Sequence, residues 1–151
     1  MAKRPAYIRH ISRVKPFRYA RPEHGIAAAA RDIGAAVGTK LIGVDVCVIA
    51  PGKNSSRFHR HKHKEEFFYV LSGRCRVRIG RKFHDLKAGD AVSRLAGAKE
   101  AHQFSNPTRQ PCSVLMFGVM AGQGVQDVIA YPDLGKILLV GSRGGRRWKS
   151  L

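Results

Sequence analysis

The chain has 151 residues, the length of one globular domain with a single buried core. Hydrophobic residues make up 44% of it, including seven Phe and four Tyr, so the composition excludes wholesale disorder. The chain has 28 Lys and Arg residues against 10 Asp and Glu, and the net charge of +18 makes nucleic acid or another polyanion a candidate partner.

Two further observations bear on where the protein works. No apolar run approaches the roughly 20 residues that span a bilayer, and the basic N-terminus from Met1 to Pro5 lacks the apolar stretch of a secretory signal. Each cysteine lies in an apolar, strand-like pattern that is typical of a buried free thiol: Cys47, Cys75 and Cys112. We therefore expect a cytoplasmic protein with reduced cysteines and no membrane partner.

Residues 1–39 show little regular pattern. Residues 1–25 combine Arg, Pro and aromatic residues without a helical or strand period. The alanine-rich stretch from Ala27 to Val37 contains Gly34 and is followed by Gly38, so we expect at most a short helix there. The whole segment is predicted to be an N-terminal arm that packs over the domain or across a partner subunit.

From residue 40 the pattern changes to that of strands. Leu41 to Ile49 is apolar and rich in β-branched residues, and Pro51-Gly52 ends it with turn chemistry. Further short strands are expected at 66–71, 74–79, 83–86, 91–95, 102–105 and 112–120. Many short strands separated by turn residues predict an all-β sandwich or barrel over residues 40–140.

The C-terminal part carries two apolar strips, 128–131 and 137–140, which are expected to extend a sheet or to exchange with a neighbouring subunit. Residues 141–151 are basic and predict a mobile tail, with Trp148 as an anchor if the tail docks.

The positive charge concentrates in residues 3–21, in Arg74 to Arg78 and in the tail. In the second of these, arginines alternate with apolar residues, which usually means only a solvated outer face. The sharper hypothesis is an anion-binding surface whose binding falls steeply with salt. No recognition helix or aromatic-rich nucleic-acid motif accompanies it, so nucleic-acid binding ranks last.

The most informative stretch runs from Phe58 to Glu66. In a strand, His59 and His61 point to the same side while Arg60 points to the other. Glu66 opens the next strand, which could bring its carboxylate to the same pocket, and His102 follows far downstream. Three imidazoles and one carboxylate are ligands for zinc, iron, nickel or manganese.

Here the sequence resembles a known family. Pro51-Gly52, followed by His59-x-His61-x4-Glu66-x6-Gly73, is similar to the first signature of the cupin superfamily. The second signature appears as Gly89-Asp90, Ala96-Gly97 and His102-x3-Asn106. Two departures are Leu95, where the family usually has proline, and the four residues rather than two between Gly97 and His102.

The resemblance is to small single-domain bacterial cupins. It implies a double-stranded β-helix, which is a jelly-roll barrel, and a divalent metal held by His59, His61, Glu66 and His102. It also implies a homodimer, since the family is commonly dimeric. The identity of the metal (Fe, Mn, Ni or Zn) stays open.

Several neighbouring residues compete for a place in this site. His63 would point to the same side of a strand as His59, but it lies where the chain must turn, so we expect it at the rim of the site. Glu65 lacks the family distance to Gly73 and is expected to be exposed. Glu100 is a candidate proton-transfer group, although an ordinary exposed carboxylate is the commoner outcome. His10, His24 and His84 have no partner spacing.

These residues favour metal-dependent chemistry, oxygenase-like or isomerase-like, on a small molecule inside the barrel. Cationic neighbours such as Arg57 and Lys64 favour an anionic substrate. The alternative is a non-enzymatic cupin that binds or senses a small molecule or sugar, because one fold hosts both kinds of protein. No catalytic residue is assigned by the sequence.

Overall fold

The structure is a computed structural model that describes residues 5–122 and 124–151. Its regular elements are almost all strands: β1 (Phe17–Arg21), β2 (Ile26–Asp32), β3 (Ile42–Ile49), β4 (Arg60–His61), β5 (Glu66–Ser72), β6 (Arg74–Ile79), β7 (Lys82–Lys87), β8 (Ala91–Arg94), β9 (His102–Ser105), β10 (Cys112–Val119), β11 (Asp127–Tyr131), β12 (Lys136–Val140) and β13 (Arg146–Ser150). One short helix, α1 (Ile33–Val37), and three single 3₁₀ turns complete the described part of the chain.

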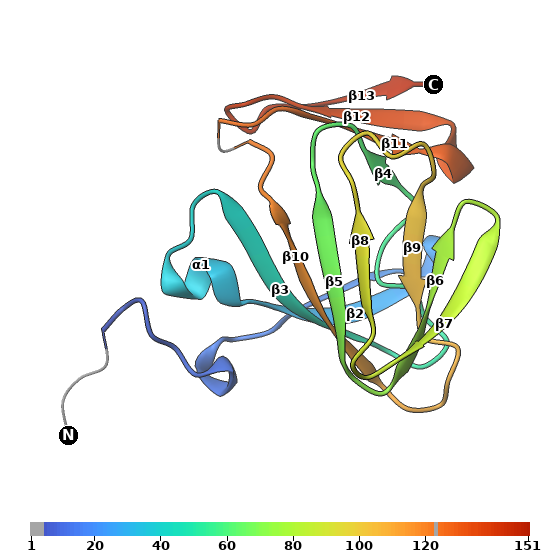
Figure 1. Ribbon diagram of the computed structural model, residues 1–151. Coiled ribbons are helices and arrows are strands. Elements are labelled where there is room, and N and C mark those ends of the chain that lie inside the picture. Colours follow the sequence, from blue (N-terminus) through green and yellow to red (C-terminus); the bar gives the residue numbers. More distant parts are fainter. Residues whose placement is uncertain (1–4, 123) are drawn as a thin grey trace.

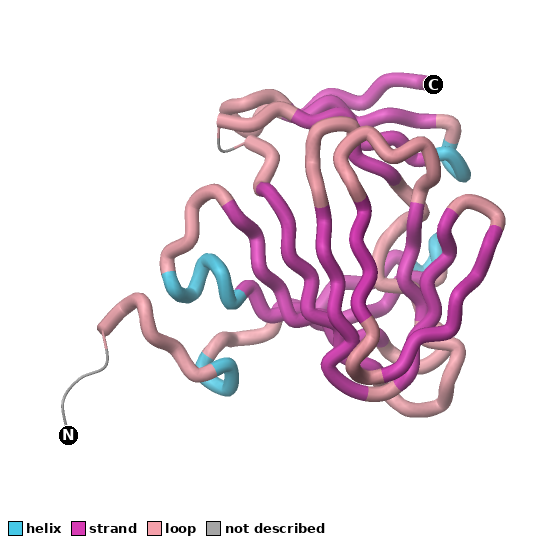
Figure 2. The backbone as a smooth tube through the Cα atoms, in the orientation of Figure 1, coloured by secondary structure: helices cyan, strands magenta, loops and turns pink. Residues whose placement is uncertain are grey.

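The strands form three antiparallel sheets that together enclose a barrel (Figure 1). The largest has the order β1-β2-β3-β10-β5-β8, and the smallest, β7-β6-β9, stands opposite it. The third sheet, β13-β12-β11-β4, lies across one end of the barrel, where Figure 2 draws its strands in magenta. The all-β jelly-roll prediction is confirmed.

Alternation along the strands places the core between the sheets. On β5, Phe68 and Val70 are buried while Phe67, Tyr69 and Leu71 are exposed, because successive side chains point to opposite faces. The buried cluster inside the barrel gathers side chains from both walls: Ala28, Cys47, Ile49, Phe68, Val70, Cys75, Val77, Phe104, Cys112 and Val114. All three cysteines are free, as the sequence predicted.

The N-terminal segment is more regular than expected. The alanine-rich stretch forms strand β2 and only then the short helix α1. Ala28 and Ala30 face the core from β2, whose two edges pair with β1 and β3. Pairing on both sides satisfies the backbone and overrides the helical preference of alanine, so this part of the arm is an integral part of the large sheet.

The C-terminal stretch corrects the prediction of a mobile tail at 141–151. Arg146–Ser150 forms β13, which pairs with β12 along its whole length. The ring of Trp148 lies 5.4 Å from that of Tyr131, so the anchor role raised for this residue matches a contact in the fold. All residues of β13 are exposed, and β12 pairs with one of its two edges.

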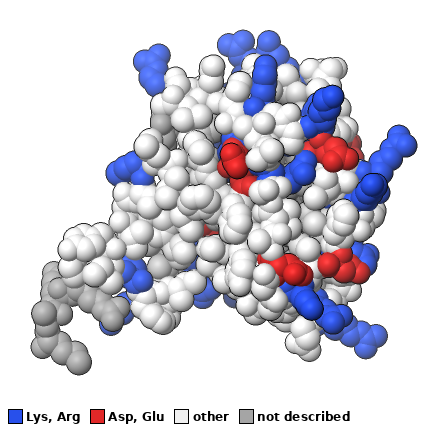
Figure 3. Space-filling view, in the orientation of Figure 1, with Lys and Arg blue, Asp and Glu red and all other residues white. Residues whose placement is uncertain are grey.

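The surface carries its positive charge in scattered positions. On the face shown in Figure 3, Lys and Arg side chains are distributed over several elements rather than gathered into one patch. Some of them are paired locally: Arg76 contacts Asp85 at 2.6 Å and Arg78 contacts Asp133 at 2.8 Å. In the described part of the chain, no helix has the length and apolar character needed to span a membrane.

Candidate metal centre

The backbone brings residues from distant parts of the sequence to one place at the end of the barrel. His59 and His102 exchange two backbone hydrogen bonds, of 3.0 and 2.7 Å, so the residue 43 positions downstream becomes a direct neighbour. His61 lies on the two-residue strand β4, which pairs with β11, and Glu66 begins β5. The cluster therefore combines side chains from the segment at β4, from the start of β5 and from the start of β9.

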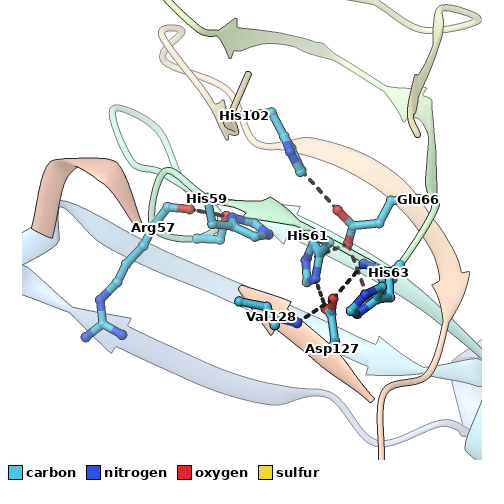
Figure 4. Close-up of polar contacts among 10 residues, drawn as sticks. Arg57, His59, His61, His63, Glu66, His102, Asp127 and Val128 are labelled. Carbon is cyan, nitrogen blue, oxygen red and sulfur yellow. Dashed lines mark hydrogen bonds and ion pairs between the residues drawn. The ribbon is translucent and has the colours of Figure 1, made fainter. Parts of the chain in front are cut away.

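The donor atoms converge (Figure 4). His59, His61 and Glu66 each offer one ligand atom, and these three atoms lie within 4.8 Å of one another. His61 Nε2 lies 3.6 Å from Glu66 Oε1, and His102 Nε2 lies 3.3 Å from Glu66 Oε2. The rings of His59 and His102 are 4.7 Å apart between centroids. The structure thus brings all four predicted side chains together.

Hydrogen bonds orient two of the imidazole rings. His59 Nδ1 donates to the carbonyl oxygen of Arg57 at 2.7 Å, and His61 Nδ1 donates to Oδ2 of the buried Asp127. A ring that donates through Nδ1 keeps the lone pair of Nε2 available. This is the usual arrangement of metal-binding histidines, whose second nitrogen is held by a carbonyl or a carboxylate.

The charge states suit a cation. Burial, together with the neighbouring His102 and His61, lowers the pKa of His59 to about 3, so its ring is neutral at pH 7. Burial alone would raise the pKa of Glu66, but His102, His61 and Lys64 outweigh burial and hold that pKa well below its ordinary value. Neutral imidazoles and an ionised carboxylate are the forms that bind metal ions.

Two buried polar atoms of the cluster, Glu66 Oε2 and His102 Nδ1, have no hydrogen-bond partner among residues 5–122 and 124–151. Buried polar atoms without partners are rare and call for an explanation. A divalent ion held by nitrogen and carboxylate donors would supply the missing partner for Glu66 Oε2, and the donor set matches the first-row metals.

Beside the cluster lies a pocket of about 200 Å³. His59, Glu66 and His102 form part of its wall, and the apolar side chains of Phe68, Phe104 and Met116 form another part. The remaining polar lining consists of Tyr19, Asp45, Ser55, Ser56 and Lys64. Lys64 Nζ lies 3.1 Å from Glu66 Oε1, so a cation borders the pocket beside the ligands.

Residues that competed for the site lie outside it. His63 and Glu65 are exposed, and Glu100 is exposed and absent from the wall of this pocket. The longer turn before His102 has a structural role: Gly97 donates a backbone hydrogen bond of 3.0 Å to the carbonyl of His61. This turn therefore helps to hold the ligand strand β4.

Sequence reasoning missed two acidic residues. Asp127, which orients His61, precedes an apolar strip and has no motif around it. Asp45, which lines the pocket, is the single acidic residue in the apolar strand β3, and a charged residue in such a strand was the available signal.

Fold and site together define a small β-barrel protein with a histidine and carboxylate cluster suited to a divalent metal. Comparison with known families names the class: residues 45–118 match the cupin domain. The chain belongs to the cupin superfamily. A search of curated proteins finds no match.

Solved structures resemble the whole chain. A proposed sugar phosphate isomerase from Acidithiobacillus ferrooxidans is 28% identical with a TM-score of 0.87, and the match covers 96% of this chain and 92% of the other. A sugar phosphate isomerase from Silicibacter pomeroyi is 22% identical with a TM-score of 0.81, covering 93% and 90%. A predicted oxalate decarboxylase from Thermotoga maritima is 19% identical with a TM-score of 0.63, covering 75% and 98%. The last two show a common fold.

Proposed function

We propose that this protein is a metal-dependent isomerase of a small anionic hydroxycarbonyl compound, and that sugar phosphates are the class to test first. The observation that carries the proposal is the convergence of the His59, His61 and Glu66 donors beside a pocket that also contains Lys64. His59, His61, Glu66 and His102 would hold the ion, which is Fe, Mn, Ni or Zn. When bound, such an ion polarises a carbonyl group and stabilises negative charge on its oxygen.

The chain's own residues supply the rest of the binding site. Lys64 offers a positive charge at the pocket wall, which favours an anionic group on the substrate. Phe68, Phe104 and Met116 add apolar surface to the pocket wall, and excluding water there strengthens each polar contact inside. The full-length similarity to the Acidithiobacillus protein, a proposed sugar phosphate isomerase, supports the choice of reaction over oxygenase-like chemistry.

The first experiment combines metal content with turnover. Protein purified without chelators is analysed for metals and assayed with triose, pentose and hexose phosphates, before and after treatment with EDTA. We expect bound metal, isomerisation that stops with EDTA and returns with one metal, and loss of both in a His59→Ala, His61→Ala double variant. His84→Ala, which changes an exposed histidine on β7, is the matched control and should behave as the wild type.

The alternative is a non-enzymatic cupin that binds a sugar-like ligand or acts as a sensor. It predicts that sugar phosphates raise the thermal midpoint of the metal-loaded protein without any product. Turnover in the first experiment excludes this alternative, and stabilisation without turnover replaces the isomerase proposal with it.

We propose a homodimer as the assembled form. Phe67, Tyr69 and Leu71 expose apolar surface on the outer face of β5, and Phe117 continues that surface on the neighbouring β10. Burying such a patch is the usual reason for association. Light scattering should give a dimer mass for the wild type and a monomer mass for Tyr69→Lys. A monomeric wild type would contradict the proposal.

The cytoplasm is the compartment we propose, since the three buried thiols suit a reducing environment. A polyanionic partner stays a prediction of the net charge alone. Binding to DNA or RNA that falls steeply with salt and survives loss of the metal ligands would support it.

A further inference from the structure

The pocket contains one carboxyl group that neither the fold nor the metal cluster uses. Asp45 lies on β3 with Cys47 and Ile49 on the same face, and both of these point into the core. Its side chain lines the pocket shared with His59, Glu66 and His102. Its Oδ1 atom is buried and has no hydrogen-bond partner in the described part of the chain.

The other acidic residues near this end of the barrel have structural partners. Asp127 accepts backbone hydrogen bonds from His63 and Val128, of 3.0 and 2.8 Å, and also holds His61. Asp32 caps helix α1 by accepting from Ala35 N at 2.7 Å. Glu66 belongs to the metal cluster. Asp45 is thus the carboxyl in the pocket wall that is available to a ligand.

Strand register places Asp45 across the pocket from the cluster. Glu66 on β5 stands opposite Gly118 on β10, which stands opposite Gly43 on β3, and Asp45 is two residues further along β3. Strands β3 and β5 are separated by β10, hence by about 10 Å. The two glycines carry no side chains, and the space over them is occupied by Lys64 at Gly118 and by Met120 at Gly43. Glu66 and Asp45 line one pocket, so a small molecule held in it can contact both.

Lys64 occupies the border of the same space. A Cβ atom on Gly118 would come within 2.8 Å of Lys64 Cε, so the lysine side chain passes directly over this glycine. Its ammonium group reaches Glu66 and also acts electrostatically on Asp45. One molecule in the pocket would therefore meet the metal cluster, a cation and a carboxylate at once.

We infer that Asp45 is the general base of the reaction, a catalytic residue that transfers a proton between two neighbouring carbon atoms of an α-hydroxycarbonyl substrate. This inference rests on the proposed isomerase function. The Asp45 carboxylate takes the proton from the carbon next to the carbonyl, and the C–H electron pair forms the carbon–carbon double bond of an enediolate. Asp45 then returns the proton to the former carbonyl carbon, the neighbouring hydroxyl group becomes the carbonyl, and its proton passes to the former carbonyl oxygen. No oxidant or reductant is required.

The surroundings of Asp45 suit this role. Burial and the like charge of Asp32 raise its pKa, whereas Lys64 lowers it and does not cancel the rise. Tyr19 and Cys47 are the other titratable groups beside it, and burial raises the pKa of Cys47 to about 11 and that of Tyr19 further, so both are neutral at pH 7. A carboxylate with a raised pKa is a stronger base, and general bases contribute about 10²–10⁴-fold to rates.

The test follows the proton rather than the product alone. Metal-loaded wild type, Asp45→Asn and the control Asp85→Asn, which changes an exposed aspartate on β7, are incubated with triose, pentose and hexose phosphates in D₂O. NMR then measures deuterium incorporation at carbon. We expect Asp45→Asn to lower kcat and exchange at least 100-fold, with metal content and KM close to those of the wild type. Asp85→Asn should exchange normally.

A second variant separates chemistry from structure. Asp45→Ala leaves space for a small carboxylate, so added formate should restore part of the exchange in a concentration-dependent way. Normal exchange in Asp45→Asn, or an Asp45→Ala variant that is folded, metal-loaded and inactive even with formate, overturns the role of Asp45 while leaving the isomerase proposal standing. Isomerisation without exchange in the wild type overturns the role of Asp45 alone, and absence of both isomerisation and exchange with every substrate overturns both proposals.

Discussion

Replacing Asp127 by Asn tests whether the cluster is a metal site whose ligands are held in one orientation. Asp127 is 2% exposed and uses both carboxylate oxygens, one for His61 Nδ1 and one for the backbone N–H groups of His63 and Val128. Asparagine has nearly the same shape but carries one N–H₂ group in place of an acceptor. Only one side of the new residue can accept hydrogen bonds.

Either orientation of the new amide has a cost. If the N–H₂ group faces His61, it donates to Nδ1, and the ring must carry its proton on Nε2, where it blocks metal binding. If the oxygen faces His61, the N–H₂ group meets the two backbone donors. Loss of such a second partner typically weakens metal affinity 10- to 100-fold, which corresponds to about 1.4–2.7 kcal/mol at 25 °C.

The assay is a competition between protein and a chromogenic zinc chelator, with Trp148 fluorescence as a second readout. Trp148 is the only tryptophan of the chain, and its ring contacts Tyr131, whose ring in turn lies 6.0 Å from that of His59. Asp133→Asn, which changes an exposed residue paired with Arg78, is the control. A folded Asp127→Asn protein with wild-type zinc affinity would refute the reasoning.

Four further outcomes are expected. His102→Ala should weaken zinc binding by at least as much as Asp127→Asn in the same chelator competition, and unchanged affinity would remove His102 from the ligand set. The thiols of Cys47, Cys75 and Cys112 should be inert toward a disulfide reagent until the protein is denatured, because each residue is 1% exposed and burial raises the pKa of Cys47 to about 11. Fast labelling of the native protein would contradict their burial. The metal-free protein should lose stability as the pH falls from about 6.5 toward 3. The reason is that His59 binds its proton only near pH 3 in the folded protein, whereas the unfolded chain binds it near pH 6.5. A thermal midpoint independent of pH in that range would be contrary evidence. Asp32→Asn retains a capping side chain for α1 but removes the negative charge that helps to raise the pKa of Asp45. The acidic limb of the pH profile of kcat/KM should therefore move to lower pH. An unmoved limb would argue against Asp45 as the titrating base.

The barrel and the convergence of the candidate metal ligands could be predicted because their signals are local or have fixed spacing. Strand alternation in β5 and turn residues such as Gly73 define elements over a few residues, and the sequence places His59 and His61 on one strand face by parity alone. His102 has no such local signal. It could be assigned through the cupin signature, and the fold accounts for it by pairing its backbone with that of His59.

The terminal strands could not be predicted from local sequence because their stability comes from partners. The alanines of β2 favour a helix in isolation, and only pairing with β1 and β3 selects the strand. The basic β13 lacks alternation between apolar and polar residues, since all its residues are exposed and it is held mainly by backbone pairing with β12 and by the contact of Trp148 with Tyr131. A strand with no buried residue leaves no pattern of burial in the sequence.

Asp127 was missed for a related reason, and its position explains why the C-terminal sheet matters for the site. The strand β4 has only two residues, too few to be stable alone, and it is held by β11 on one side and by the Gly97 turn on the other. Asp127 is the first residue of β11, so one element both pairs with the strand that carries His61 and supplies the carboxylate that orients its ring. Because β11 is itself paired with β12, and β12 with β13, the geometry of the cluster depends on residues up to Ser150. The candidate metal centre therefore depends on strands outside the 45–118 region that matches the cupin domain.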